Sequence, residues 1–177
     1  MAESTAADAR PEDGAGASPS PGEPRSIPLG FTGDDQYQSF VQTLSEGLVE
    51  AGFPGTAVVF QGSAVTGASF SEGRPFGPHS DYDIALAGPG IFGRAAELGI
   101  PTRSRRTRTG PLTVAEFRAL GLADLRRTLR SLVGRRVSFM IYSELDVAVH
   151  RSESLIAQHA PTAEIPSADP GIEEGAM

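Results

Sequence analysis

Asp81 and Asp83 stand two positions apart, followed by the apolar residues 84–87. In an extended strand, side chains at positions i and i+2 point to the same face, so both carboxylates are expected on one side. Two adjacent carboxylates repel each other unless a proton or a cation intervenes. Mg²⁺ prefers oxygen ligands and is often held by one or two carboxylates together with substrate phosphates. The spacing therefore predicts a magnesium site formed by Asp81 and Asp83.

A Gly-Ser pair follows residues 56–61, an apolar and β-branched segment that is predicted to be a strand. Gly62 has no side chain that would keep the backbone away from a phosphate. Ser63 offers a hydroxyl and an amide at a turn that is expected to open a brief helical segment, where a helix N-cap is its alternative role. We therefore expect Gly62 and Ser63 to hold phosphates.

The elements that must position these residues mix helices and strands. Residues 34–52 carry apolar side chains at helical spacing behind two candidate caps, Asp34 and Asp35. The other predicted helices cover residues 92–98, 123–133 and 144–151 and a segment that begins at Thr113; the other strands cover 82–87 and 137–142. This mixture predicts an α/β or α+β domain, with a small mixed sheet flanked by helices.

The predicted domain occupies residues 34–152. Residues 1–33 are rich in Pro, Gly, Ala and acidic residues, and they are predicted to be a disordered tail. Residues 153–177 are predicted to be a flexible acidic tail for the same reason.

Charge is unevenly distributed along the chain. The formal net charge is −7, yet residues 101–136 contain ten arginines and two acidic residues, a local balance of +8. Such a segment attracts phosphates, either of a nucleotide or of RNA. Within the predicted loop 101–111, the four arginines are candidates for phosphate contact or are simply solvated, whereas Arg126, Arg127 and Arg130 are predicted to form an exposed helix face.

Composition excludes some classes of protein. The chain has no cysteine, which excludes disulfides and thiolate chemistry. No apolar run is long enough to span a membrane, and the N-terminus lacks the basic and apolar regions of a secretion signal. A cytoplasmic location is therefore expected.

The order of these features, from the first helix through Gly62-Ser63 to Asp81-Tyr82-Asp83 and a later strand, resembles the nucleotidyltransferase superfamily, which shares the palm of DNA polymerase β. The resemblance covers residues 34–150. It implies that Asp81 and Asp83 bind Mg²⁺ and act in catalysis, and that Gly62 and Ser63 hold the phosphates of a nucleoside triphosphate. The implied reaction moves a nucleoside monophosphate to an acceptor, which is RNA such as tRNA, a protein or a small molecule.

The family pattern usually includes a third acid on the later strand, where this chain has Ser138. Residues 72–79 also lengthen the connection between the two motifs. An alternative is therefore a catalytically degenerate module that binds nucleotide or RNA on the same fold, and a third reading is interaction with a protein alone. The segment from Gly62 to Tyr142 also resembles the toxin-associated branch of the superfamily, which implies an immunity or antitoxin partner.

Overall fold

The computed structural model of this chain describes residues 26–69, 73–151 and 153–157. The disorder predicted for residues 1–25 and 158–177 lies outside this part of the chain. The elements follow in the order α1 (Asp34–Glu50), β1 (Ala57–Gln61), α2 (Ser63–Thr66), β2 (Tyr82–Ala87), α3 (Pro89–Glu97), β3 (Thr102–Arg103), β4 (Arg108–Thr109), α4 (Val114–Ala119), α5 (Ala123–Val133), β5 (Val137–Tyr142), α6 (Leu145–Val149) and β6 (Leu155–Ile156).

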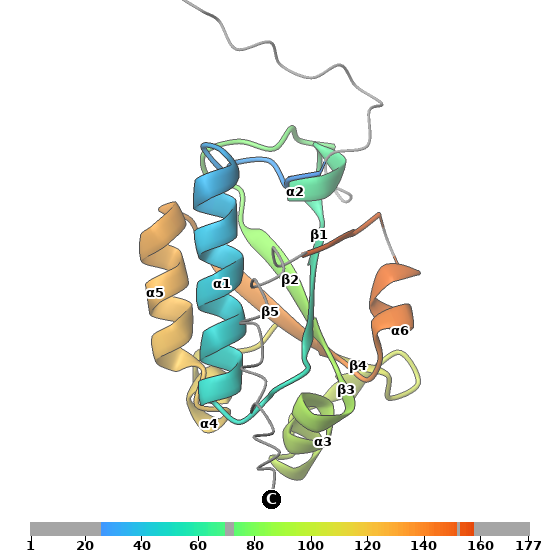
Figure 1. Cartoon of the computed structure of the whole chain (residues 1–177). Helices are drawn as coiled ribbons and strands as arrows, with labels where there is room; N and C mark the ends of the chain where they lie inside the picture. The colour runs from blue at the N-terminus through green and yellow to red at the C-terminus, as the bar shows by residue number, and fades with distance from the viewer. Residues whose placement is uncertain (1–25, 70–72, 152, 158–177) are drawn as a thin grey trace, which may run out of the picture.

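The sheet is mixed and has the strand order β3-β4-β5-β2-β1-β6 (Figure 1). At its centre β2 pairs antiparallel with β1 and parallel with β5. Short antiparallel strands complete the two edges, β4 beside β5 and β6 beside β1. The predicted class, an α/β fold with a mixed sheet and flanking helices, is therefore confirmed.

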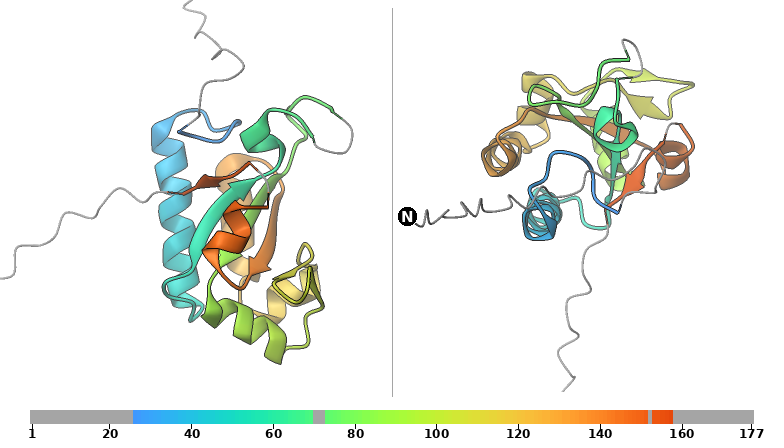
Figure 2. Two further views of the ribbon diagram at one scale, coloured as in Figure 1. Left: turned by 90° about the vertical axis from the view of Figure 1, so that its right-hand side faces the viewer. Right: turned by 90° about the horizontal axis from the view of Figure 1, so that it is seen from above.

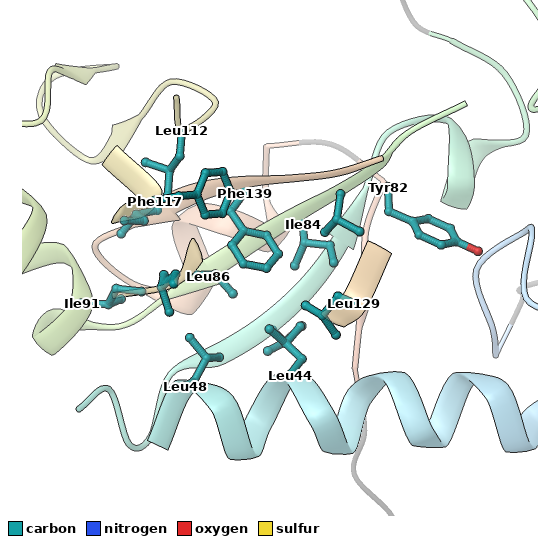
Figure 3. Packing of buried hydrophobic residues seen from close by; sticks show 14 of the residues in the cluster. Leu44, Leu48, Tyr82, Ile84, Leu86, Ile91, Leu112, Phe117, Leu129 and Phe139 are labelled. Carbon is teal, nitrogen blue, oxygen red and sulfur yellow. The ribbon is translucent and has the colours of Figure 1, made fainter. Parts of the chain in front are cut away.

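Helices cover the two faces of the sheet unequally. The long helices α1 and α5 lie side by side over one face, and the short helix α6 lies over the other (Figures 1 and 2). Between α1, α5 and the sheet, Leu44, Leu129, Ile84 and Phe139 are fully buried (Figure 3). This packing is the main hydrophobic core and holds the three central strands in register.

Helix α1 forms where the apolar spacing predicted it, and its buried face includes Phe40, Leu44 and Leu48. The prediction that Asp34 or Asp35 caps this helix is wrong, because both lie within the first turn and Gly33 occupies the N-cap position. Acidic residues are nevertheless favourable there, since they face the positive end of the helix dipole.

The other helices also follow their local signals. Helix α4 begins after Thr113, and a capping box closes its start: Thr113 accepts a hydrogen bond from the Glu116 amide and Glu116 accepts one from the Thr113 amide. Helix α3 begins at Pro89, three residues earlier than predicted, because proline suits the first helical position. Helix α6 is shorter than the predicted 144–151, and Ser143 does not cap it.

Packing extends beyond the predicted boundaries, residues 34 and 152. Phe31 stacks on Tyr82 and meets Phe40 and Phe60 edge-on, so residues 26–33 join the core rather than the predicted tail. Residues 155–156 form β6, within the segment predicted to be a flexible tail. Residues 102–109 form the β3–β4 hairpin in place of the predicted loop. Each of these short segments is ordered by a partner distant in sequence, which local composition does not reveal.

In the described part of the chain, no helix combines the length and the apolar character needed to cross a bilayer.

Candidate functional site

Gly62 and Asp83 meet at one end of the central strand pair. Gln61, the last residue of β1, pairs with Asp83 of β2, so the following Gly62 lies against the Asp83 side chain. Gly62 has a φ of +69°, and a Cβ at this position would lie 2.8 Å from Oδ2 of Asp83. Both the left-handed backbone and the close approach require glycine. The predicted proximity of the Gly-Ser turn to the acidic pair is thus present in the fold.

The two aspartates flank Tyr82, which is fully buried in the core. Because side chains alternate along β2, Asp81 and Asp83 lie on the opposite side from Tyr82. Burial raises the pKa of the Asp83 carboxyl, and the negative charge of Asp81 raises it further. The ionised pair is therefore under repulsion that a divalent cation would relieve, and the donor set fits Mg²⁺.

Asp81 also faces a cation. Its Oδ2 lies 3.6 Å from Nε of Arg136, at the start of β5. The Arg136 side chain is 70% exposed, so solvent weakens this ion pair. Asp81 therefore stands between the Asp83 carboxylate and a region rich in arginine.

A cleft of about 640 Å³ opens beside Asp83 and Gly62. Met140 and Tyr142 of β5 contribute to its wall, and Arg108 and Arg151 add positive charge. The lining thus combines a carboxylate, a bare backbone turn, apolar surface and two guanidinium groups. This combination suits a ligand that has both an apolar part and phosphates.

Ser104 connects the two arginines of the cleft. Its Oγ accepts hydrogen bonds from Nε of Arg108 at 3.1 Å and, more weakly, from Nη1 of Arg151 at 3.5 Å. Ser104 lies in the β3–β4 turn, where three consecutive non-glycine residues have positive φ angles of 52° to 67°. This backbone is unfavourable for L-residues, and strain of this kind is concentrated at binding sites.

Buried polar groups beside the cleft are joined by hydrogen bonds. The Tyr142 hydroxyl donates to Oε1 of Gln61 at 3.2 Å, and Nε2 of Gln61 donates to the Ala148 carbonyl of α6 at 2.7 Å. Gln61 is only 4% exposed, so these bonds satisfy a buried amide and hold α6 against the sheet.

Ser63 and Ser138, two other positions singled out in the sequence, do not line the cleft, whereas Gly62 does. Ser63 opens the four-residue helix α2, but it does not line the cleft; Thr66, three residues later, does. Ser138 pairs with Asp83 across the parallel β2–β5 ladder, as expected for the residue in place of a third acid. Glu144 and Asp146, the acidic residues after β5 that could substitute for a third acid, do not line the cleft either.

Glu153 lines the cleft beside Asp83, but this does not complete a larger acidic site. Among the residues that the structure describes, no group of three or more His, Cys, Asp or Glu side chains is placed to hold a metal. Asp83 lines the cleft and Asp81 does not, so any metal held by both carboxylates would depend on ligand oxygens for its remaining contacts.

Comparison with known protein families, curated proteins and solved structures gave no match for this chain. The case for a function therefore depends on the site itself.

Sequence reasoning did not assign roles to Gln61, Met140 or Arg151, and it did not distinguish Arg108 among its neighbours. Gln61 was detectable, because it is the one polar residue at the end of the apolar strand β1. Arg108 and Arg151 carried no local signal, since only the pairing of β4 with β5 and the path of the chain after α6 bring them to the cleft.

Proposed function

We propose that this protein is a metal-dependent nucleotidyltransferase. The observation that carries the proposal is the contact between Gly62 and the carboxylate of Asp83, with Asp81 close enough to raise the Asp83 pKa. A phosphate-binding turn and a cation-binding acidic pair are the two parts that phosphoryl transfer needs side by side. Their adjacency supports the resemblance to the nucleotidyltransferase superfamily.

In the proposed reaction an acceptor nucleophile forms a bond to the α-phosphorus of a nucleoside triphosphate. The bond from that phosphorus to the bridging oxygen breaks, pyrophosphate leaves, and the acceptor proton is released to water. Asp81 and Asp83 would hold Mg²⁺, which neutralises charge on the phosphates. Gly62 lets the triphosphate approach the backbone, and Ser63 is the candidate hydroxyl donor at the same turn.

The cleft supplies further contacts for this substrate. Arg108 and Arg151 line the same cleft as Asp83 and would bind phosphate oxygens there, and both donate hydrogen bonds to Ser104. Met140 and the ring of Tyr142 offer apolar surface for the nucleoside.

The test compares transfer of labelled nucleotide by the wild-type protein with transfer by Asp81→Asn and Asp83→Asn, using the four triphosphates, Mg²⁺ and a cell lysate as the source of acceptors. We expect each substitution to lower the rate at least about 100-fold, the scale of losing one preorganised electrostatic contact. Arg94→Gln, on the exposed surface of α3, is the matched control and should leave transfer unchanged. Equal transfer by all four proteins would contradict the catalytic assignment.

One observation favours a second candidate, a nucleotide- or RNA-binding module without catalysis. Ser138 is the β5 residue paired with Asp83, and a serine is a weak ligand for Mg²⁺ and a poor base at neutral pH. Calorimetry with nucleotide and Mg²⁺, combined with a long incubation for product, separates the two candidates. Binding without any product would support the module.

The acceptor, the choice of nucleotide and a role as a bacterial toxin domain with an immunity or antitoxin partner belong to the proposal. The lysate experiment addresses the acceptor directly, because the molecule that gains label is a nucleic acid, a protein or a small molecule.

A further inference from the structure

A second hollow, of about 690 Å³, lies between α4, α5 and the start of β5. Six of its eleven lining residues are arginines and none is acidic. We call it the arginine groove, and its arginines are Arg118, Arg126, Arg127, Arg130, Arg135 and Arg136. The α5 arginines were predicted to form an exposed helix face, and Arg127 and Arg130 are indeed exposed. Residues of α4 and the segment 134–136 line the same hollow beside them.

Two of these guanidinium groups are held in place by the protein. Arg126 lies 4.5 Å from the ring centroid of Phe117, and its Nε donates to the Val137 carbonyl at 3.0 Å. Arg135 lies 4.7 Å from the Phe76 ring centroid, and its Nη1 donates to the Gly77 carbonyl at 2.8 Å. Each group retains further N–H donors for a ligand. Positioning of this kind lowers the entropic cost of binding.

The positive charge of the groove is only partly neutralised. Arg127 pairs with Asp124 and Arg136 with Asp81, and all four side chains are solvent-accessible. Arg118 and Arg130 have no ion pair with any described residue. Burial and the charges of Arg130 and Arg136 lower the pKa of Arg126, which indicates crowding of like charges. An anionic ligand would relieve this crowding.

The number of arginines indicates a ligand with more than one phosphate. Six guanidinium groups line one groove, and a nucleic-acid strand carries one phosphate for each nucleotide. Guanidinium groups bind phosphate oxygens bidentately. Phe117 is buried beneath Arg126, so it offers no platform for stacking bases.

We infer that the arginine groove binds the phosphodiester backbone of a nucleic acid, without reading its bases. This inference does not need the proposed transfer reaction. The groove reaches Arg136, which contacts Asp81, so a bound chain lies beside the acidic pair. If the protein does transfer nucleotides, this chain is placed to be the acceptor.

The test measures the binding of fluorescently labelled single-stranded RNA and DNA of equal length to the full chain, without nucleotide, by anisotropy over a range of salt concentrations. The groove variant carries Arg118→Gln, Arg127→Gln and Arg130→Gln, all at exposed positions. We expect it to bind at least about tenfold more weakly, and to lower the slope of log K against log salt by about 2, because each lost phosphate contact removes roughly 0.7.

The matched control removes the same charge elsewhere. Arg103→Gln, Arg105→Gln and Arg106→Gln are also exposed but lie in the β3–β4 hairpin, outside the groove. This variant should bind like the wild type. Equal binding of RNA and DNA would assign recognition to the backbone alone, and tighter RNA binding would add a 2′-hydroxyl contact.

Three results would overturn the inference: no binding by the wild type, equal losses in the two arginine variants, or displacement by polyglutamate as readily as by unlabelled RNA. The last result would assign the groove to an acidic protein segment. Binding of RNA or DNA by the wild type, together with no nucleotide transfer by the wild type, would contradict the proposed function and leave the groove assignment in place.

Discussion

The two faces of the central sheet carry alternate residues of the same strands, and they differ in burial and in polarity. The face beneath α1 and α5 carries Phe60, Ile84 and Phe139, all fully buried. The opposite face carries Asp83, Ser138 and Met140, which remain partly exposed, and the five-residue helix α6 covers only part of it. In the view from above, Figure 2 shows α1 and α5 on one side of the sheet and the short helix α6 on the other.

The α1/α5 face mainly stabilises the fold, whereas the α6 face carries the candidate site. The α1/α5 face buries large apolar side chains, whose removal from water is the main favourable term in folding. The α6 face is lined near the helix by small residues such as Ala85 and Ala87, and beyond the helix it opens as the cleft. Substitutions on the two faces should therefore have separable effects.

The largest contrast is expected for two neighbours on β5. Phe139→Ala empties a fully buried position on the α1/α5 face and should lower the free energy of unfolding by about 3–5 kcal/mol. Met140→Ala, on the partly exposed α6 face, should lower it by about 1 kcal/mol. Urea unfolding measures both values. Equal losses would show that the two faces contribute alike to stability.

A smaller effect is expected at the Gly62 turn. Gly62→Ala and Gly121→Ala both place a side chain at a positive φ, 69° and 73°, which costs about 1 kcal/mol. Only the former brings a Cβ to 2.8 Å from the Asp83 carboxylate, whereas the described residues around Gly121 leave open space. We expect Gly62→Ala to lower the free energy of unfolding by about 2 kcal/mol in total. Equal losses of unfolding free energy in the two variants would show that the close approach of Gly62 to Asp83 does not affect stability.

Two tyrosines test the polar connection on the α6 face. Tyr142→Phe removes the hydroxyl that donates to buried Gln61, and it should lower the free energy of unfolding by about 1 kcal/mol. The Tyr82 hydroxyl is buried on the α1/α5 face beside the Arg135 guanidinium, and no described residue makes a hydrogen bond of good geometry with it, so Tyr82→Phe should change stability little. Thermal unfolding compares the two. A greater loss of stability from Tyr82→Phe would show that the Tyr82 hydroxyl contributes more to the fold than the Tyr142 hydroxyl does.

The smallest effect concerns Asp83 and depends on pH. Its folded-state pKa is raised above the ordinary 3.8, so the folded state binds this proton more tightly than the unfolded state does. The resulting stabilisation is full below the unfolded pKa and is lost as pH rises through the folded pKa. Asp83→Asn should therefore match the wild type in acid and be more stable at neutral pH, by about 1 kcal/mol at most.

Chemical unfolding across this pH range, in metal-free buffer, measures the difference. Added Mg²⁺ should stabilise the wild type and reduce the advantage of the variant, since the cation relieves the repulsion between the carboxylates. An advantage that is constant with pH would show that the Asp83 charge is not destabilising.

Local patterns in the sequence determined much of the framework. The helical spacing of Tyr37, Phe40 and Leu44 placed α1, and the β-branched and alternating segments placed β1 and β5. The order of the Gly-Ser turn and the Asp-x-Asp strand drew attention to Gly62 and Asp83, which are neighbours in the fold, while their roles stay predictions. These predictions succeeded because periodicity and turn chemistry act over a few neighbouring residues.

Tertiary structure alone decided the remainder. The two-residue strands β4 and β6 exist only because the longer strands β5 and β1 offer them hydrogen-bonding partners, and β3 in turn pairs with β4. Phe31 packs against the rings of Phe60 and Tyr82 from the distant strands β1 and β2. The arginines of α5 become part of a groove only when α4 and the segment 134–136 lie beside them. The sequence alone determined the residue types and their local periods. Which distant side chains face one another depended on the pairing of strands and the packing of helices, because those contacts are fixed by the whole fold.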